Sequence, residues 1–203
     1  MGFLEPVFLI KTAGYIGLFA IVFAESGLFV GFFLPGDSLL FTAGFLASQG
    51  LLNIWFLVPL VFSAAILGDN VGYAFGRRVG PRIFKKDDSI FFHKDHVRRA
   101  EEFYKVHGAK TLVLARFTPV IRTFAPIVAG VGHMHYPIFL FYNIIGAVLW
   151  AIGMPLIGYF LGAFVPGVDQ YLIPIILVII TVSMLPGVFH VGREYLAHKR
   201  RSR

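Results

Sequence analysis

Long apolar stretches constrain what this chain can fold into more than any other feature of its sequence. A helix that crosses a membrane needs about 20 mainly apolar residues. Three stretches meet that requirement with little interruption: 51–76, 137–163 and 171–191. Two further apolar stretches, 7–48 and 111–135, are broken by prolines and charges. The pattern predicts an all-α polytopic membrane protein and excludes a soluble enzyme or a nucleic-acid-binding protein.

Most charged residues are concentrated in two segments. Residues 77–110 contain ten Lys/Arg and five Asp/Glu, and residues 193–203 contain five Lys/Arg and one Glu. Basic segments beside apolar spans face the cytoplasm. We therefore expect a basic cytoplasmic loop at 77–110, with an amphipathic helix, and a basic cytoplasmic tail at 193–203. Orientation in the membrane then explains the net charge of +7 without a nucleic-acid partner.

The two basic segments also restrict the topology of the apolar stretches between them. Because both face the cytoplasm, an even number of crossings must connect them. The stretches 137–163 and 171–191 supply two crossings, so 111–135 is expected to enter and leave on one side as a re-entrant hairpin. Irregular backbone at membrane depth requires protein or water around it. The hairpin contains four residues that a lipid-facing helix avoids: Arg116, Pro119, Arg122 and Pro126.

An internal repeat favours two related units. A shift of 86 positions places Ala43-Gly44 on Ala129-Gly130, and Gly72-Tyr73 on Gly158-Tyr159. The spans that contain the second pair must run in opposite directions across the membrane. Inverted-topology repeats of this kind are typical of secondary transporters, whose broken helices build a site near the midplane.

We therefore predict a single membrane domain, 1–203, made of two inverted repeats. The first repeat, 7–76, contains a re-entrant hairpin at about 25–48, which follows a crossing at 7–24. The second repeat, 111–163, contains the opposed hairpin at 111–135. This arrangement leaves both termini in the cytoplasm.

Five ionisable residues lie inside apolar sequence: Glu25, Asp37, Asp69, Arg116 and Arg122. Each costs roughly 2.5–3.5 kcal/mol when it is placed unpaired at a bilayer centre. We therefore expect these side chains to share one polar cavity. One interpretation is a set of static ion pairs, and the other is a functional site, the default for intramembrane ionisable groups.

The residue types suggest different roles within that cavity. The arginine fork matches phosphate oxygens, so Arg116 and Arg122 are candidates for holding an anionic headgroup. Intramembrane carboxylates relay protons in transporters, which makes Glu25 and Asp37 candidates for proton coupling. Asp69 is expected to support the site or to tether its own helix. Four residues at the breaks are expected to support the hairpins: Pro35, Gly36, Pro119 and Pro126.

Motifs for covalent, nucleotide or metal chemistry are absent from the sequence. It has no cysteine and no P-loop, GxGxxG or HExxH motif. We therefore expect a transporter with no cofactor and no metal, and not an enzyme.

Three segments resemble the DedA family of bacterial inner-membrane proteins, whose domain is also called the SNARE-associated or VTT domain. They are Glu25-Ser-Gly with Leu34-Pro35-Gly36-Asp37, Gly68-Asp69-Asn70-x-Gly72-Tyr73, and the stretch 115–126. The resemblance implies opposed re-entrant hairpins and proton-motive-force-dependent lipid translocation. Undecaprenyl phosphate recycling and phosphatidylethanolamine flipping are family activities. The essential acids of the family correspond to Glu25 and Asp37, and its essential arginines to Arg116 and Arg122.

Transport of undecaprenyl phosphate is the function we expect, with membrane lipids and protons as partners. Three alternatives remain open: a proton-coupled ion or small-solute transporter, a phosphatidylethanolamine flippase, and a structural membrane organiser with static ion pairs. The lipid, the direction of movement, the proton stoichiometry and the oligomeric state are not specified by the sequence.

Overall fold

The computed structural model describes residues 6–28, 36–83 and 108–165, together with single positions between 102 and 181. The regular elements in these ranges are all helical, which confirms the predicted all-α class. Two helical stretches, Ile54–Val79 and Tyr136–Phe164, are long and apolar enough to cross a membrane. Pro35, most of the basic loop, most of the span 171–191 and the tail 193–203 lie outside the described residues.

The first two helices differ from the predicted boundaries of the first hairpin. Helix α1 runs from Pro6 to Gly27, and α2 runs from Gly36 to Ser48. Glu25 therefore lies in the last turn of α1 and does not open the hairpin predicted at 25–48. The apolar α1 sequence contains no proline between its first residue and Gly27, so nothing in it stops the helix earlier.

The long helix α3 extends from Ile54 to Ile83. It begins after Asn53, whose side-chain Oδ1 accepts a hydrogen bond of 2.9 Å from the backbone N–H of Trp55. This cap satisfies one of the free N–H groups at the helix start. Gly50 has a φ of +74°, a left-handed conformation that suits glycine in the turn between α2 and α3. The helix therefore starts slightly later than the predicted span 51–76 and continues beyond it.

The second half of the chain contains the predicted break. The short helix α5 covers Thr111–Ala115, and α6 covers Pro119–Val131. Thr118 between them is extended, with φ −122° and ψ 109°, as expected for a residue that precedes proline. Arg116 thus lies before the break and Arg122 after it.

The predicted span 137–163 is a composite helix. It consists of α7 (Tyr136–Ala147), a π-helical turn η2 (Val148–Ile152) and α8 (Gly153–Phe164). Pro155 cannot donate a hydrogen bond to the preceding turn, and a π-bulge is one way in which a helix accommodates such a defect. The interruption therefore falls just before Pro155.

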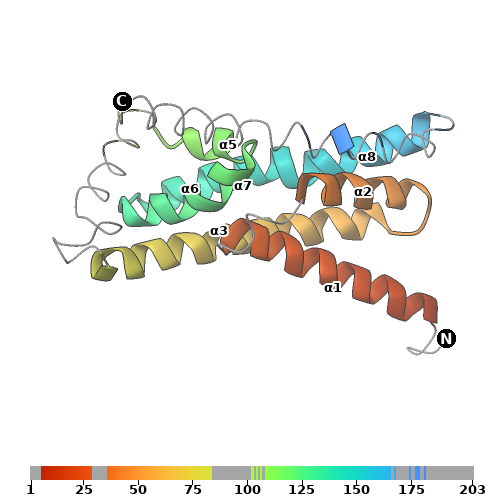
Figure 1. Ribbon diagram of the computed structural model, residues 1–203, viewed down its shortest axis with the longest axis horizontal. Helices are drawn as coiled ribbons and strands as arrows, with labels where there is room; N and C mark the ends of the chain where they lie inside the picture. The colour runs from red at the N-terminus through yellow and green to blue at the C-terminus, as the bar shows by residue number, and fades with distance from the viewer. Residues whose placement is uncertain are drawn as a thin grey trace, which may run out of the picture.

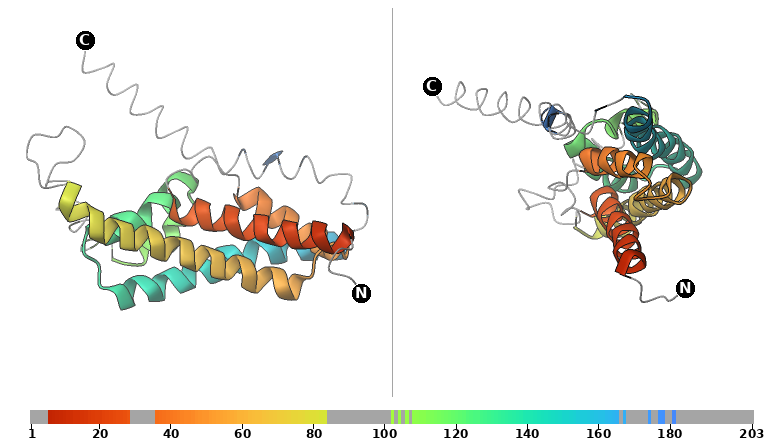
Figure 2. Two further views of the ribbon diagram at one scale, coloured as in Figure 1. Left: turned by 90° about the horizontal axis from the view of Figure 1, so that it is seen from below. Right: turned by 90° about the vertical axis from the view of Figure 1, so that its right-hand side faces the viewer.

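The two halves pack against each other reciprocally. Figure 1 shows that α2 and α6 both begin near mid-length and run toward opposite ends of the molecule. Helix α2 packs against α8, and α6 packs against α3, so each short helix contacts the long helix of the other half. The end-on view in Figure 2 shows the described helices gathered into one bundle.

Glycines permit both of these contacts. A Cβ atom at Gly44 would overlap the Pro155 carbonyl, and a Cβ at Gly130 would overlap the Tyr73 carbonyl. The shift of 86 positions that relates Gly44 to Gly130 in the sequence therefore relates two equivalent close contacts in space. Small residues allow such close approach of helix backbones in lipid.

Replacing Gly44 with alanine is expected to lower the free energy of unfolding by roughly 1–3 kcal/mol, the usual effect of overpacking. The added methyl group must displace the backbone of α8 at Pro155. Gly14→Ala is the matched control, because nothing lies within 4 Å of a Cβ at that position. Thermal unfolding of the detergent-solubilised variants measures the difference, and equal midpoints for the two variants would contradict the packing argument.

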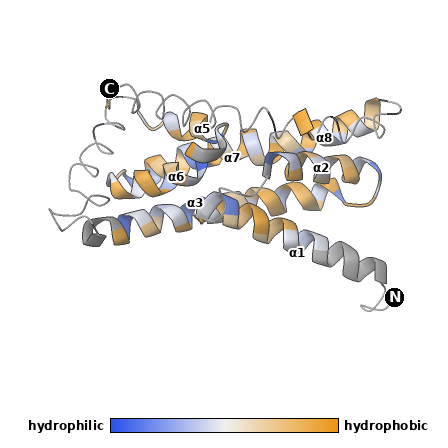
Figure 3. Ribbon diagram, viewed as in Figure 1, coloured by the Kyte–Doolittle hydropathy of each residue, from blue (hydrophilic) through white to orange (hydrophobic). Residues whose placement is uncertain are grey.

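The distribution of polarity is that of a membrane protein. Large apolar side chains are exposed, including Trp55 (87%), Phe141 (60%) and Phe164 (76%). Charged side chains are inside, as shown by Glu25 (1%) and Arg122 (6%). Figure 3 shows apolar colour over most of the helices and hydrophilic colour where α1 ends and α2 begins. Extensive exposed apolar surface of this kind marks contact with lipid.

Candidate functional site

All five ionisable residues singled out in the sequence take part in buried ion pairs. Four of them are nearly inaccessible, and the fifth, Asp37, has a side chain that is 16% exposed. They lie on five helices or their ends: Glu25 on α1, Asp37 on α2, Asp69 on α3, Arg116 at the end of α5 and Arg122 on α6. The expectation that these charges pair inside the protein is confirmed, but they form two clusters, and only Asp69, Arg116 and Arg122 line a shared cavity.

Arg122 is held by two carboxylates. Its Nη1 donates to Asp37 Oδ1 at 2.6 Å, and its Nη2 donates to Glu25 Oε1. The guanidinium thus joins the last turn of α1 to the first turn of α2. Arg122 itself lies in the first turns of α6, so the starts of α2 and α6 meet at this ion triad.

Glu25 has one satisfied oxygen and one unpaired oxygen. Oε1 also accepts a hydrogen bond of 3.1 Å from the Gly36 N–H at the start of α2. Among the described residues, Oε2 has no hydrogen-bond partner although it is buried. A Cβ at Gly36 would overlap the Glu25 carboxylate, so glycine at this position allows the carboxylate to reach the helix start. This contact gives the predicted supporting residue Gly36 a defined role.

Arg116 forms a second buried cluster. Its Nη2 donates to Asp69 Oδ2 on α3 and to Asn143 Oδ1 on α7. A Cβ at Gly146 would lie 2.7 Å from the Arg116 Cδ, so the absence of a side chain there makes room for the arginine stem. Asp69 therefore supports the site through Arg116 and does more than tether its own helix.

Trp150 connects the two clusters, and sequence reasoning missed it. Its indole Nε1 donates to Asp37 Oδ1 at 2.6 Å, and its ring centre lies 4.7 Å from the Arg122 Cζ. The Arg116 Cζ lies 6.0 Å from the same ring. Both arginines are therefore within cation–π range of one indole. Trp150 sits on the π-turn η2, an element that is frequent at functional sites.

Asn143 was also missed, although the sequence contained a signal for it. It is the only Asn, Gln or charged residue in the apolar stretch 137–163, and a buried amide in such a helix needs a polar partner. Trp150 carried no comparable signal, because tryptophan is common in apolar spans.

A small cavity lies between the two arginines. Its volume is about 10 Å³, which is room for approximately one water molecule. Pro126, one of the predicted supporting residues, lines it, and Pro119 starts α6. The polar groups in the lining are Asp69, Arg116, Arg122 and Asn143.

The charges of the site are those of the ion pairs and of two helix N-termini. Three carboxylates face two guanidiniums, so the fully ionised site carries one excess negative charge. The N-termini of α2 and α6 meet there, and each contributes a partial positive charge. In transporters built from broken helices, such N-termini point at anionic substrate groups.

Comparison with known proteins identifies the family of the chain. The VTT domain matches residues 34–160. The chain is 48% identical to protein DedA of Escherichia coli over 92% of its own length and 84% of that protein. It belongs to the DedA family. It is also 44% identical to an uncharacterized membrane protein of Mycobacterium leprae, covering 97% of this chain and 90% of the other.

Membership of the DedA family agrees with the apolar surface described above. A further relative, the inner membrane protein YqjA of E. coli, is 34% identical over 73% of this chain and 67% of its own length. These names support a location in the inner membrane. No solved structure matches the chain. The VTT match includes Asp37, Asp69 and both arginines, whereas Glu25 precedes it.

Proposed function

We propose that this DedA-family protein is a proton-linked lipid transporter that moves a phosphate-bearing lipid between leaflets, with undecaprenyl phosphate as the expected substrate. The observation that carries the proposal is the buried Arg122 guanidinium where the starts of α2 and α6 meet, with Arg116 lining the same small cavity. Arginine forks and helix N-termini are both phosphate-binding groups. Their position inside an apolar membrane protein favours a lipid as the carrier of that phosphate.

The ion triad offers a way to couple protons to phosphate binding. When Glu25 takes up a proton at its unpaired Oε2, the excess negative charge of the site is neutralised. The Arg122 fork is then held less firmly and can turn to a phosphate oxygen. Release of the phosphate and loss of the proton restore the ion pairs with Glu25 and Asp37. One proton is bound and released in each such cycle.

Transport requires the described arrangement to open. The cavity between the arginines holds about one water, so a headgroup can enter only if the helix starts separate. The reciprocal packing of α2 on α8 and α6 on α3 supports an inverted repeat with two opposed re-entrant hairpins. Alternate opening of the two halves would expose the arginines to each leaflet in turn. The distribution of basic residues supports an orientation with both termini in the cytoplasm.

Reconstitution tests the proposed function directly. Proteoliposomes containing a fluorescent polyprenyl phosphate are assayed for leaflet accessibility, with and without a pH gradient. We expect lipid movement that responds to the gradient, and parallel assays with labelled phosphatidylethanolamine distinguish the two lipid classes. Ion or solute flux without lipid movement would overturn the proposal in favour of a small-solute transporter.

A second candidate function, static bracing of the membrane domain, is favoured by the closed ion pairs. The double variant D69R/R116D, in which the acid and the base of this pair change places, discriminates between static bracing and transport. A purely structural pair tolerates the exchange, whereas a transport site loses its phosphate-binding fork at the required position. This pair is a better choice than Asp37 with Arg122, because the latter exchange would place a new carboxylate beside Glu25. Wild-type transport by D69R/R116D would favour the structural role.

A further inference from the structure

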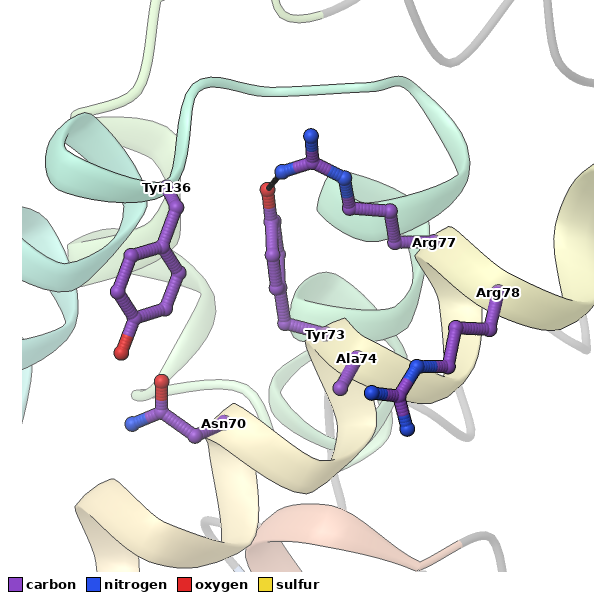
Figure 4. Close-up of a pocket in the computed structure, with 6 residues that line it drawn as sticks. All are labelled: Asn70, Tyr73, Ala74, Arg77, Arg78 and Tyr136. Atoms are coloured by element: carbon purple, nitrogen blue, oxygen red, sulfur yellow. Dashed lines mark hydrogen bonds between the residues drawn. The ribbon is translucent and has the colours of Figure 1, made fainter.

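A second cavity lies outside the ion-pair site, along α3. It is an open groove of about 620 Å³ between α3 and the start of α7. Figure 4 shows its lining, with the two arginine side chains extending from α3 in different directions and the Tyr136 ring beside the Tyr73 ring. The lining residues are Asn70, Tyr73, Ala74, Arg77, Arg78 and Tyr136.

Tyr73 fixes one side of the groove. Its hydroxyl donates to the Met134 carbonyl and accepts a hydrogen bond of 3.0 Å from Arg77 Nη1. The Tyr73 ring is 3% exposed and stacks on Phe139 at 4.4 Å between centroids. The Arg77 guanidinium is therefore oriented by a rigid partner, and its other N–H groups remain able to donate.

Among the residues that the structure describes, the groove lining has two cations and no carboxylate. Within the described part of the chain, neither Arg77 nor Arg78 forms an ion pair, and both side chains are exposed. The buried Oδ1 of Asn70 has no hydrogen-bond partner among the described residues. The free N–H groups of these two exposed guanidiniums can donate to the oxygens of a phosphate group.

The surroundings favour a lipid as the source of that phosphate. Tyr136 is 42% exposed, and Val71 and Phe75 on the flank of α3 are each 43% exposed. Tyrosine at the edge of an apolar surface is characteristic of the membrane interface. Phosphate that reaches such a groove from the membrane carries acyl or prenyl chains, which the exposed apolar flank can contact.

The groove and the ion-pair cavity are neighbours. Asn70 lines the groove and the adjacent Asp69 lines the cavity. Phe139 lines the cavity and stacks on Tyr73, which lines the groove. A thin wall formed by this ring pair and one turn of α3 therefore separates the two spaces.

We propose that the groove is a docking site for the phosphate of an anionic lipid headgroup, used before the headgroup reaches Arg116 and Arg122. Its place in the transport route rests on the proposed function, whereas phosphate binding itself depends only on the groove. Arg77 and Arg78 hold the phosphate oxygens, and Tyr73 positions Arg77. Passage to the buried arginines requires movement of the Tyr73–Phe139 wall.

The test is a binding titration of the full chain in detergent with short-chain phosphatidic acid, followed by native mass spectrometry. We expect Arg77→Gln and Arg78→Gln each to weaken binding about tenfold, the equivalent of one charge-assisted hydrogen bond. Tyr73→Phe keeps the ring but loses its hydroxyl, and is expected to weaken binding by a smaller factor. Lys110→Gln, which removes an exposed charge outside the groove, is expected to bind like the wild type.

Competition with inorganic phosphate separates the possible sources. If inorganic phosphate displaces the lipid only at concentrations far above that of phosphatidic acid, the groove recognises lipid. Displacement at equal concentrations would overturn the lipid assignment. Equal phosphatidic acid affinity in the wild type, Arg77→Gln and Arg78→Gln would overturn the site itself, provided that circular dichroism shows each variant to be folded.

Failure of the docking site and failure of the proposed function give different results. Arg122→Gln is expected to abolish transport while phosphatidic acid binding persists. The two groove variants are expected to need more lipid for half-maximal transport while the maximal rate is unchanged. If the groove binds lipid but the wild type moves none, the docking site stands and the transport function does not.

Discussion

Arg122→Gln is expected to abolish lipid movement and to lower the free energy of unfolding by about 3–5 kcal/mol, the usual effect of removing one partner of a buried ion pair. The substitution leaves Glu25 and Asp37 facing each other without their shared cation. Transport in proteoliposomes and thermal unfolding in detergent measure the two effects. No other single substitution considered for this site removes the cation from two carboxylates at once.

The double variant E25Q/R122Q separates stability from function. It removes one of the two uncompensated charges, so much of the lost stability is expected to return while transport stays absent. Arg122→Lys keeps the charge but loses the planar fork, and is expected to transport more slowly than the wild type. Wild-type transport by E25Q/R122Q would refute a phosphate-binding role for Arg122.

Trp150→Ala is expected to lower the free energy of unfolding by about 3–5 kcal/mol, as for other large-to-alanine substitutions in cores. Trp150 is 2% exposed and contacts both the Asp37 carboxylate and the Arg122 guanidinium. Its loss removes a hydrogen-bond donor from Asp37 and the ring beneath Arg122. Transport is expected to fall with stability, because the two ion clusters lose the side chain that connects them.

Two further variants show which contact of Trp150 matters. Trp150→Phe retains a ring under Arg122 but has no N–H for Asp37, so it isolates the effect of the hydrogen bond. Trp55→Phe is the matched control, because the other tryptophan of the chain is 87% exposed and is expected to tolerate replacement. The Trp55→Phe protein also leaves Trp150 as the only tryptophan, whose fluorescence reports pH changes at the ion triad. Equal unfolding midpoints for Trp150→Ala and Trp55→Phe would refute the connecting role.

The cluster could be predicted from the sequence because its physical cause is general. Five ionisable groups in apolar sequence are too costly to remain apart, whatever the fold. Broken helical geometry near Arg116 and Arg122 was likewise predictable, because proline restricts the backbone locally. The relation between Gly44 and Gly130 under the 86-residue shift was visible in the sequence, but the close contacts at these glycines were not predicted from it.

The partners within the cluster could not be predicted in the same way. Whether Arg116 pairs with Asp69 or with Asp37 depends on how α3 and α6 pack, which involves residues far apart in the chain. Glu25 could be placed on α1 only if the end of that helix was known, and no local signal marked where the helix ends. The role of Trp150 depends on the π-turn that directs its indole toward Asp37, and apolar periodicity does not reveal such a turn.

The reciprocal contacts of the short helices have a consequence for biogenesis. Helix α2 is synthesised well before α8, yet the face around Gly44 is shaped to fit the α8 backbone at Pro155. Until α8 has been inserted, that face lacks its final neighbour, and the Glu25 and Asp37 carboxylates lack theirs until Arg122 and Trp150 have been added. The first half of the chain is therefore incompletely packed in the membrane until α8, the last described helix, has been inserted.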